Sequence, residues 1–221
     1  MENTVKEAKF ADKKIPVLIC ALVLISGITF AAGLVVPLIG IFWLKTAVNI
    51  LFNLLNAVVA FAAMEMTGMN LEKNFKDPKQ YIIGIAVAAV LSLGIAFIPA
   101  MLGTSLVGGH QDFSAGMLIF YFFYYTLVIG PVEELIFREY IQGTLTGMIP
   151  KNKWAGVIAA SAVFGLWHWI NGSIVQVIFT FGIGLVFGFV RYLCKPVRLP
   201  GISFCHGLYD FLNHVVRMLI L

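Results

Sequence analysis

Residues 15–44 read IPVLICALVLISGITFAAGLVVPLIGIFWL and contain no charged residue, and this stretch decides the fold class. It is longer than the roughly 20 apolar residues that cross a bilayer as one helix. It follows Lys13 and Lys14. Because a cleavable signal peptide has an apolar region of only about 7–15 residues, we predict a membrane anchor that stays in the mature protein.

The composition of the whole chain agrees with a membrane protein. Of its 221 residues, 60% are hydrophobic and 12% are charged, whereas soluble domains are about 25% charged. This excludes a water-soluble globule, a disordered chain and a secreted disulfide scaffold. Further apolar stretches cover residues 46–64, 80–106, 113–132, 154–170, 174–190 and 202–216. Since no strand-like alternation is present, we predict one membrane-embedded domain over residues 1–221. It is an all-α polytopic transmembrane bundle of seven spans, or eight if a short span is hidden.

The basic residues predict the orientation of this bundle. Of the 15 Lys and Arg residues, all but Lys45 and Arg217 fall on one predicted side. That side includes the N-terminus and the loop with Lys73, so we expect a cytoplasmic N-terminus, because cytoplasmic loops are enriched in Lys and Arg. The same residues explain the net charge of +4 through contact with membrane lipids and without nucleic acid. We expect the plasma membrane as the location.

Three polar clusters interrupt the apolar stretches: EELIFR at 133–138, FGLWH at 164–168 and HGLYD at 206–210. Ionisable groups inside a membrane are costly, and by default they indicate function. On a helix, residues four apart share a face. This spacing places Glu134 beside Arg138 and His206 beside Asp210, leaves Glu133 to face another partner, and places His168 one turn after Phe164.

These residue types are suited to activating water. A carboxylate in an apolar site can act as a general base, and a neutral histidine can share the proton or deliver it to a leaving amine. A second histidine, oriented by an aspartate, can stabilise the oxyanion. Glu133, His168 and His206 could instead hold a divalent metal such as zinc, although the chain has no His-Glu-x-x-His motif. The residues leave a metal and a metal-free mechanism both open.

The order Glu-Glu-x-x-x-Arg, Phe-x-x-x-His and His-x-x-x-Asp on consecutive membrane helices resembles the CPBP intramembrane proteases. That family includes the type II CAAX prenyl endopeptidases and the bacterial Abi proteins linked to bacteriocin immunity. The resemblance covers about residues 113–213, which we predict as the catalytic core. It implies that Glu133 and His168 activate water and that His206 and Asp210 stabilise the transition state.

The same resemblance implies that Glu134 and Arg138 support the site, and Phe164, one turn before His168, can pack beneath it as a further supporting residue. The helix path lengths from the predicted cytoplasmic turns place these groups in the cytoplasmic half of the membrane, so we expect the site to open toward the cytoplasm. The resemblance also implies an endopeptidase, glutamate- or metal-dependent, that acts on a membrane-associated peptide or protein. The substrate would be a prenylated protein or a peptide precursor.

Two other functions remain open. Buried Glu, His, Asp and Arg also form proton relays, as in a proton-coupled transporter. A bacteriocin-immunity or interaction protein could keep the fold without turnover. A structural role is the main alternative for the Glu134–Arg138 pair.

Overall fold

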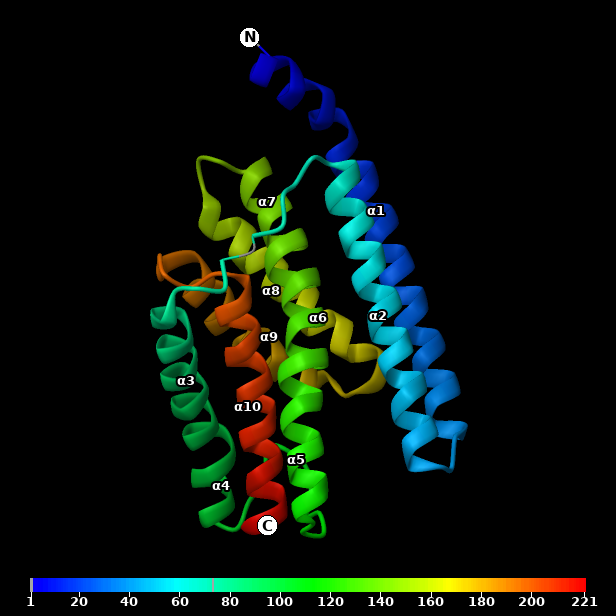
Figure 1. Ribbon diagram of the computed structural model, residues 1–221, viewed down its shortest axis with the longest axis vertical. Coiled ribbons are helices and arrows are strands. Elements are labelled where there is room, and N and C mark those ends of the chain that lie inside the picture. The colour runs from blue at the N-terminus through cyan, green and yellow to red at the C-terminus, as the bar shows by residue number, and fades with distance from the viewer. Residues whose placement is uncertain (1, 73) are drawn as a thin grey trace. The chain divides into compact units, whose positions relative to one another are not determined.

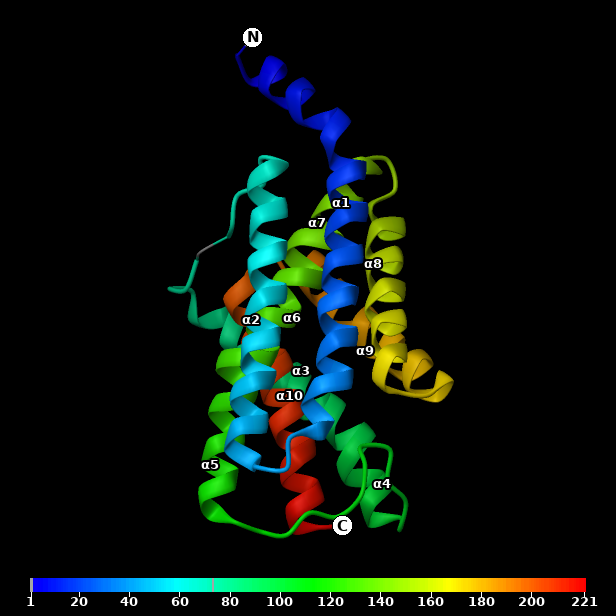
Figure 2. The ribbon, with the colours of Figure 1, turned by 90° about the vertical axis from the view of Figure 1, so that its right-hand side faces the viewer.

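The computed structural model describes residues 2–72 and 74–221, so Lys73, which we assigned to a cytoplasmic loop, lies outside the described residues. Every regular element in the described residues is a helix, as Figures 1 and 2 show. This confirms the predicted all-α class.

Among the described residues, five helical stretches are long and apolar enough to cross a membrane. They are Lys13–Leu38, Phe42–Met66, Pro78–Met101, Ala115–Met148 and Ile174–Leu193. Lys153–Trp167 is apolar but shorter. Several such helices make this a multi-pass membrane protein, while the count of seven spans and the cytoplasmic N-terminus stay predictions.

The chain forms two compact units, each built from two segments. Unit 1 contains Met1–Glu72 and Leu135–Leu193, and unit 2 contains Lys73–Glu134 and Cys194–Leu221. The helices of unit 1 are α1 (Glu2–Val35), η1 (Val36–Leu38), α2 (Phe42–Met66), η4 (Leu135–Gln142), α7 (Gly143–Met148), α8 (Lys153–Trp167), η5 (His168–Asn171) and α9 (Ile174–Leu193). The helices of unit 2 are α3 (Pro78–Ser92), η2 (Leu93–Phe97), α4 (Ile98–Met101), α5 (Ala115–Tyr124), η3 (Tyr125–Ile129), α6 (Gly130–Glu134) and α10 (Leu199–Leu219).

Local sequence explains where several helices begin. The Asp77 side chain accepts a hydrogen bond from the Lys79 backbone N–H, and proline follows it at the first helical position. Ser114 caps α5 and Asn152 caps α8 in the same way. Such side chains satisfy N–H groups that have no partner within the helix.

The turn between the first two spans differs from the sequence-based expectation. The charge-free stretches 15–44 and 46–64 meet at Lys45. In the structure, the 3-10 segment η1 with Pro37 ends at Leu38, and α2 begins at Phe42. Lys45 therefore lies in the first turn of α2. Proline and glycine end helices independently of charge, and the pair Pro37 and Gly40 decides this turn.

Unit 1 combines an α1–α2 hairpin, visible in Figures 1 and 2, with the closely packed pair α8 and α9. A Cβ atom on Gly165 of α8 would lie 2.8 Å from the Val177 carbonyl oxygen of α9. On the opposite helix, a Cβ atom on Gly184 would lie 3.0 Å from the Phe164 ring. Small residues let membrane helices approach this closely, and close packing is a main source of their association.

Unit 2 is organised around α10, which contacts α3, α5, η3 and α6. A Cβ atom on Gly207 would lie 2.6 Å from the Thr126 Cα atom in η3. A Cβ atom on Gly84 of α3 would lie 3.1 Å from the Gly201 carbonyl oxygen of α10. Across the same α3–α10 contact, the Gln80 side-chain oxygen accepts a hydrogen bond from the Gly201 N–H at 3.1 Å. Glycines thus allow α10 to lie against its neighbours on two sides.

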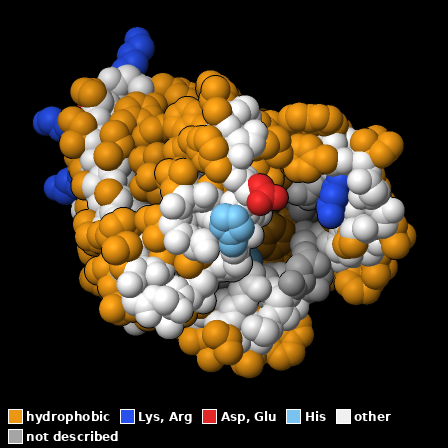
Figure 3. Space-filling model, turned by 90° about the horizontal axis from the view of Figure 1, so that it is seen from below, with side chains coloured by type: hydrophobic (Ala, Val, Ile, Leu, Met, Phe, Trp, Pro, Cys, Tyr) orange, Lys and Arg blue, Asp and Glu red, His pale blue; other side chains and the backbone are white. Residues whose placement is uncertain are grey.

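Large apolar side chains cover the outside of the helices. Val23 is 66% exposed and Val90 is 69% exposed. On the face shown in Figure 3, hydrophobic side chains far outnumber charged ones. Soluble monomers rarely expose such continuous apolar surface, so these side chains are the lipid-facing surface of a membrane protein.

The Gly207 contact generates a stability prediction. We expect Gly207→Ala to lower the free energy of unfolding by about 1–3 kcal/mol, because the added methyl group meets backbone that has no room to move. The control is Gly182→Ala in α9, where a Cβ atom would have no neighbour within 4 Å. That control should be neutral or slightly stabilising. Thermal unfolding in one detergent compares the two variants, and equal midpoints would contradict the packing described here.

Candidate active site

The short helix α6 carries both adjacent glutamates of the first motif. It follows the π-helical segment η3, and the chain continues from Glu134 into a second π-helical segment, η4. π-Helical turns are rare and are frequent at functional sites. Within unit 2, a Cβ atom on Gly130 of α6 would lie 2.8 Å from the Gly207 backbone nitrogen of α10. The two backbones are therefore in direct contact just before the glutamates.

His206 lies at the centre of a cluster of carboxylates in unit 2. Its Nδ1 atom is 2.8 Å from Oε1 of Glu134. Its Nε2 atom is 3.8 Å from Oε2 of Glu133 and 3.6 Å from Oδ2 of Asp210. Glu134 is fully buried and His206 is 4% exposed, whereas the Asp210 side chain is 25% exposed. Three carboxylates from two helices thus face one imidazole, and the cluster is most open at Asp210.

The geometry assigns different roles to the two ring nitrogens of His206. In the short contact, Nδ1 donates to the Glu134 carboxylate, because an ionised carboxylate can only accept a hydrogen bond. Such a partner fixes the ring orientation and tautomer. Nε2 is then directed toward Glu133 and Asp210 at distances longer than a direct hydrogen bond. Separations of this size are the range that one water molecule bridges, so Nε2 and the two carboxylates can exchange a proton through water.

The remaining motif residues lie together in unit 1. Nδ1 of His168 is 2.8 Å from the Phe164 carbonyl oxygen, and the two rings meet edge to face with centroids 4.7 Å apart. The Arg138 guanidinium lies 4.9 Å from the centre of the Phe164 ring. Because a carbonyl oxygen only accepts, Nδ1 of His168 carries the proton, and Nε2 of the neutral ring is an acceptor. His168 is thereby prepared to take a proton.

The structure therefore groups the seven predicted residues into two sets. Unit 2 brings together Glu133, Glu134, His206 and Asp210. Unit 1 brings together Arg138, Phe164 and His168. The roles proposed for all seven residues stay predictions.

The metal site that the sequence left open can be compared with the arrangement of the His, Cys, Asp and Glu side chains in the structure. Within residues 2–72 and 74–221, no group of three or more His, Cys, Asp or Glu side chains is arranged to hold a metal ion. The alternative set of Glu133, His168 and His206 draws on both units and stays a prediction. We derive the chemistry below from side chains alone.

Sequence reasoning missed three polar contacts. It paired Glu134 with Arg138 by spacing, but the structure adds the Glu134–His206 contact between helices. It also assigned Arg191 only to a basic loop. In unit 1, Arg191 of α9 bonds both Glu72 and Glu139, the latter at 3.2 Å. The sequence holds no spacing signal for these partners, because they lie 119 and 52 residues from Arg191.

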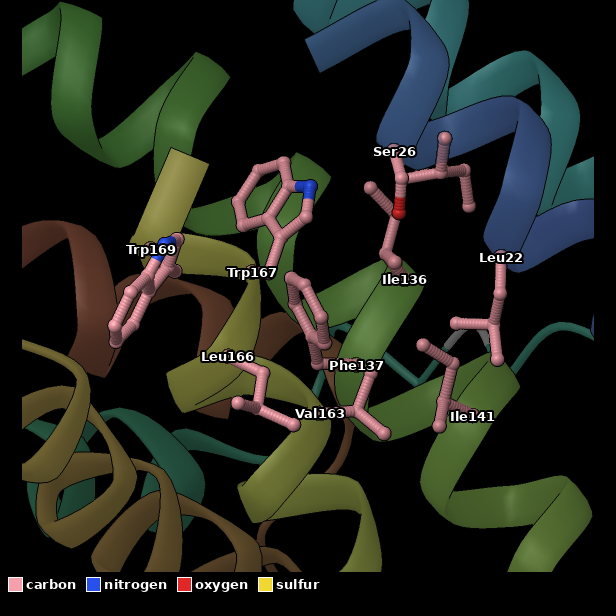
Figure 4. Close-up of a pocket in the computed structure, with 10 residues that line it drawn as sticks. Leu22, Ser26, Ile136, Phe137, Ile141, Val163, Leu166, Trp167 and Trp169 are labelled. Carbon is pink, nitrogen blue, oxygen red and sulfur yellow. The ribbon is translucent and has the colours of Figure 1, made fainter. Parts of the chain in front are cut away.

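Unit 1 also contains two cavities. One has a volume of about 280 Å³ and polar walls that include Arg138, Glu139 and Arg191. The other has about 440 Å³ and is almost entirely apolar, as Figure 4 shows. Its walls come from α1, η4, α8 and η5 and include Phe137, Trp167 and Trp169. This second cavity can accommodate an apolar group.

Comparisons with known proteins support the family resemblance. The family model described as "Type II CAAX prenyl endopeptidase Rce1-like" matches residues 115–212. A protein of Mycoplasma capricolum subsp. capricolum, described as "Uncharacterized protein", is 27% identical over 219 aligned positions that cover 86% of this chain. The chain spans 62% of the length of that relative. No solved structure matches the chain.

The Glu134–His206 contact can be tested by a double-mutant cycle on protein stability. We expect Glu134→Leu and His206→Phe each to destabilise the protein, because each leaves the other buried polar group without this partner. The double variant should lose less than the sum, with a coupling of about 1–3 kcal/mol. The matched substitutions at His110 and Asp112, an exposed pair 3.8 Å apart, should show no coupling. Additive losses at Glu134 and His206 would contradict the contact.

Proposed function

We propose that the protein is an intramembrane endopeptidase, because residues 115–212 match the family model of the type II CAAX prenyl endopeptidase Rce1-like proteins. It hydrolyses a peptide bond of a membrane-associated or lipidated substrate. The observation that carries this proposal is the buried His206 with Glu134 at Nδ1 and with Glu133 and Asp210 facing Nε2. An oriented imidazole beside a second carboxylate is suited to proton transfer with water.

In the proposed reaction, Glu133 is the general base. It takes a proton from water while the water oxygen bonds to the peptide carbonyl carbon, and the carbonyl oxygen becomes an oxyanion. His206 in its doubly protonated form donates Nδ1–H to Glu134 and Nε2–H toward that oxyanion, with Asp210 orienting the ring. The carbon–nitrogen bond then breaks. The proton held by Glu133 passes to the leaving amine, which closes the balance of one water consumed per bond.

We assign His168 to the water-activation step together with Glu133. Its motif supports this assignment, and so does its tautomer, because the Phe164 carbonyl holds the proton on Nδ1. In the neutral ring, Nε2 is then the acceptor nitrogen, and we propose that it shares the proton of the attacking water. Phe164 and Arg138 act as positioning residues through the ring contacts that surround His168.

Two observations support the proposed substrate class. An enzyme with lipid-facing walls meets substrates that are themselves in the membrane, and the 440 Å³ apolar cavity of unit 1 is suited to an apolar side chain or a lipid modification. We therefore propose a prenylated protein or a membrane-bound peptide precursor as substrate. We further propose that the protein acts in the plasma membrane and that the site opens to the cytoplasm.

The role of Glu133 can be tested with the charge-removing variant Glu133→Gln. It should lower the rate of peptide cleavage by about 10²–10⁴-fold, because the amide no longer accepts the proton of water. The assay uses purified protein in liposomes with quenched fluorogenic membrane peptides, with and without a prenyl group. Glu65→Gln makes the same change at an exposed carboxylate and should retain the wild-type rate. Equal rates for Glu133→Gln and wild type would refute the enzymatic proposal and favour an immunity or interaction role.

His168 requires a separate test, because its assignment rests on its motif and tautomer. We expect His168→Asn to lower kcat by at least about tenfold with little change in KM, as removal of a proton-transfer group does. The matched control is His110→Asn in an exposed loop, which should leave both constants unchanged. If His168→Asn and His110→Asn behave alike, His168 takes no part in the reaction.

A further inference from the structure

Polar residues continue along α10 beyond the proposed site. His206, Asp210 and His214 are spaced four residues apart, so they follow one face of this helix. His206 and Asp210 are in contact through Nε2 and Oδ2 at 3.6 Å. Arg217 follows within one further turn and donates a hydrogen bond to the Gly109 carbonyl oxygen at 3.0 Å. The face thus runs from the carboxylate cluster to the loop at the C-terminal end of α10.

His214 is the unexplained member of this face. It is 3% exposed, and neither ring nitrogen has a hydrogen-bond partner among the residues that the structure describes. Its sequence neighbour Asn213 is also buried but is satisfied, because it accepts a hydrogen bond from Ser92 at 2.8 Å. A purely structural histidine would be expected to resemble Asn213, since nearly all buried polar side chains are hydrogen-bonded.

The surroundings of His214 are polar at their edges. The Tyr121 ring lies against the imidazole with centroids 3.8 Å apart, and the Tyr125 ring lies 5.9 Å away. Both tyrosines carry hydroxyl groups that donate and accept hydrogen bonds. Buried polar groups without a protein partner are usually bonded to ordered water, provided that several polar groups converge there. An imidazole, two phenols and the neighbouring Asp210 are such a set.

We propose that His214 binds ordered water and that this water forms a hydration path along α10 to Asp210 and His206. The role of the path rests on the proposed function, because each hydrolysed peptide bond consumes one water molecule. The path runs along α10 between the carboxylate cluster and the Arg217 end of the helix. The partial exposure of Asp210, in contrast to His206 and Glu134, is consistent with water arriving along this face.

The water itself can be detected without any enzymatic assay. Brief X-ray irradiation converts bound water into hydroxyl radicals that oxidise adjacent side chains, and mass spectrometry locates the products. The full-length protein in lipid nanodiscs should show oxidation of His214 several-fold faster than of Phe187, a fully buried ring in unit 1. Oxidation of His214 as slow as that of Phe187 would overturn the proposal, whatever the activity of the protein.

Two variants test whether His214 holds the water. In His214→Leu, the oxidation of Tyr121 should fall several-fold relative to wild type, because the apolar side chain offers no hydrogen bond. In His214→Gln, which keeps a donor and an acceptor, the oxidation of Tyr121 should be retained. Equal oxidation of Tyr121 in wild type and both variants would overturn the assignment to His214. If His214→Leu does not fold, the wild-type measurement still decides.

A peptidase assay tests the supply of water to the site. We expect His214→Leu to lower kcat about tenfold with KM unchanged, and His214→Gln to restore most of kcat, since the loss concerns water and not substrate binding. If His214 is hydrated but His214→Leu keeps the wild-type kcat, the supply route is wrong. If His214 of the wild-type protein is hydrated but the protein cleaves no peptide, the proposed function fails, whereas the water site at His214 remains.

Discussion

The contact between the Gly130 and Gly207 backbones is the constraint on which the proposed chemistry depends. A Cβ atom on Gly130 would collide with the α10 backbone, and one on Gly207 would collide with the η3 backbone. The continuous η3–α6 segment can therefore approach α10 this closely only with glycine at both positions. Glu133 and Glu134 lie about one helical turn after Gly130. His206 immediately precedes Gly207. The close approach of the two backbones therefore brings carboxylates and imidazole within 4 Å of one another.

Burial then determines what this group of side chains can do. Charges are expensive in an apolar environment unless partners compensate them, and the Glu134–His206 hydrogen bond provides such a partner. Orientation follows from the same bond, because a ring held through Nδ1 presents Nε2 in one direction. Glu133 and Asp210 both lie in that direction. A histidine fixed in this way does not need to reorganise when a proton moves, which is the condition under which electrostatic stabilisation is most effective.

Much of the fold follows from local sequence, whereas the site depends on contacts between helices. Charge-free runs predict the apolar helices, because a membrane span must satisfy its backbone internally. The charge-free runs do not mark the turn near Pro37, because proline and glycine end helices independently of charge. Spacing correctly keeps His206 and Asp210 on one face, where they are in contact. Spacing holds no information about which helices touch, and so the Glu134–His206 contact emerges only from packing at glycine.

A charged cluster in unit 1 and the one in unit 2 illustrate that a buried charge can have a structural role or a role in proton transfer. In unit 1, Glu139 uses Oε1 to accept the Glu72 backbone N–H and Oε2 to bind Arg191. An arginine stays protonated under all ordinary conditions, so this cluster can hold the chain in place but cannot exchange a proton. In unit 2 the basic partner is an imidazole, a group that can both take and give a proton. The same cost of burial therefore stabilises structure in the first cluster and supports proton transfer in the second.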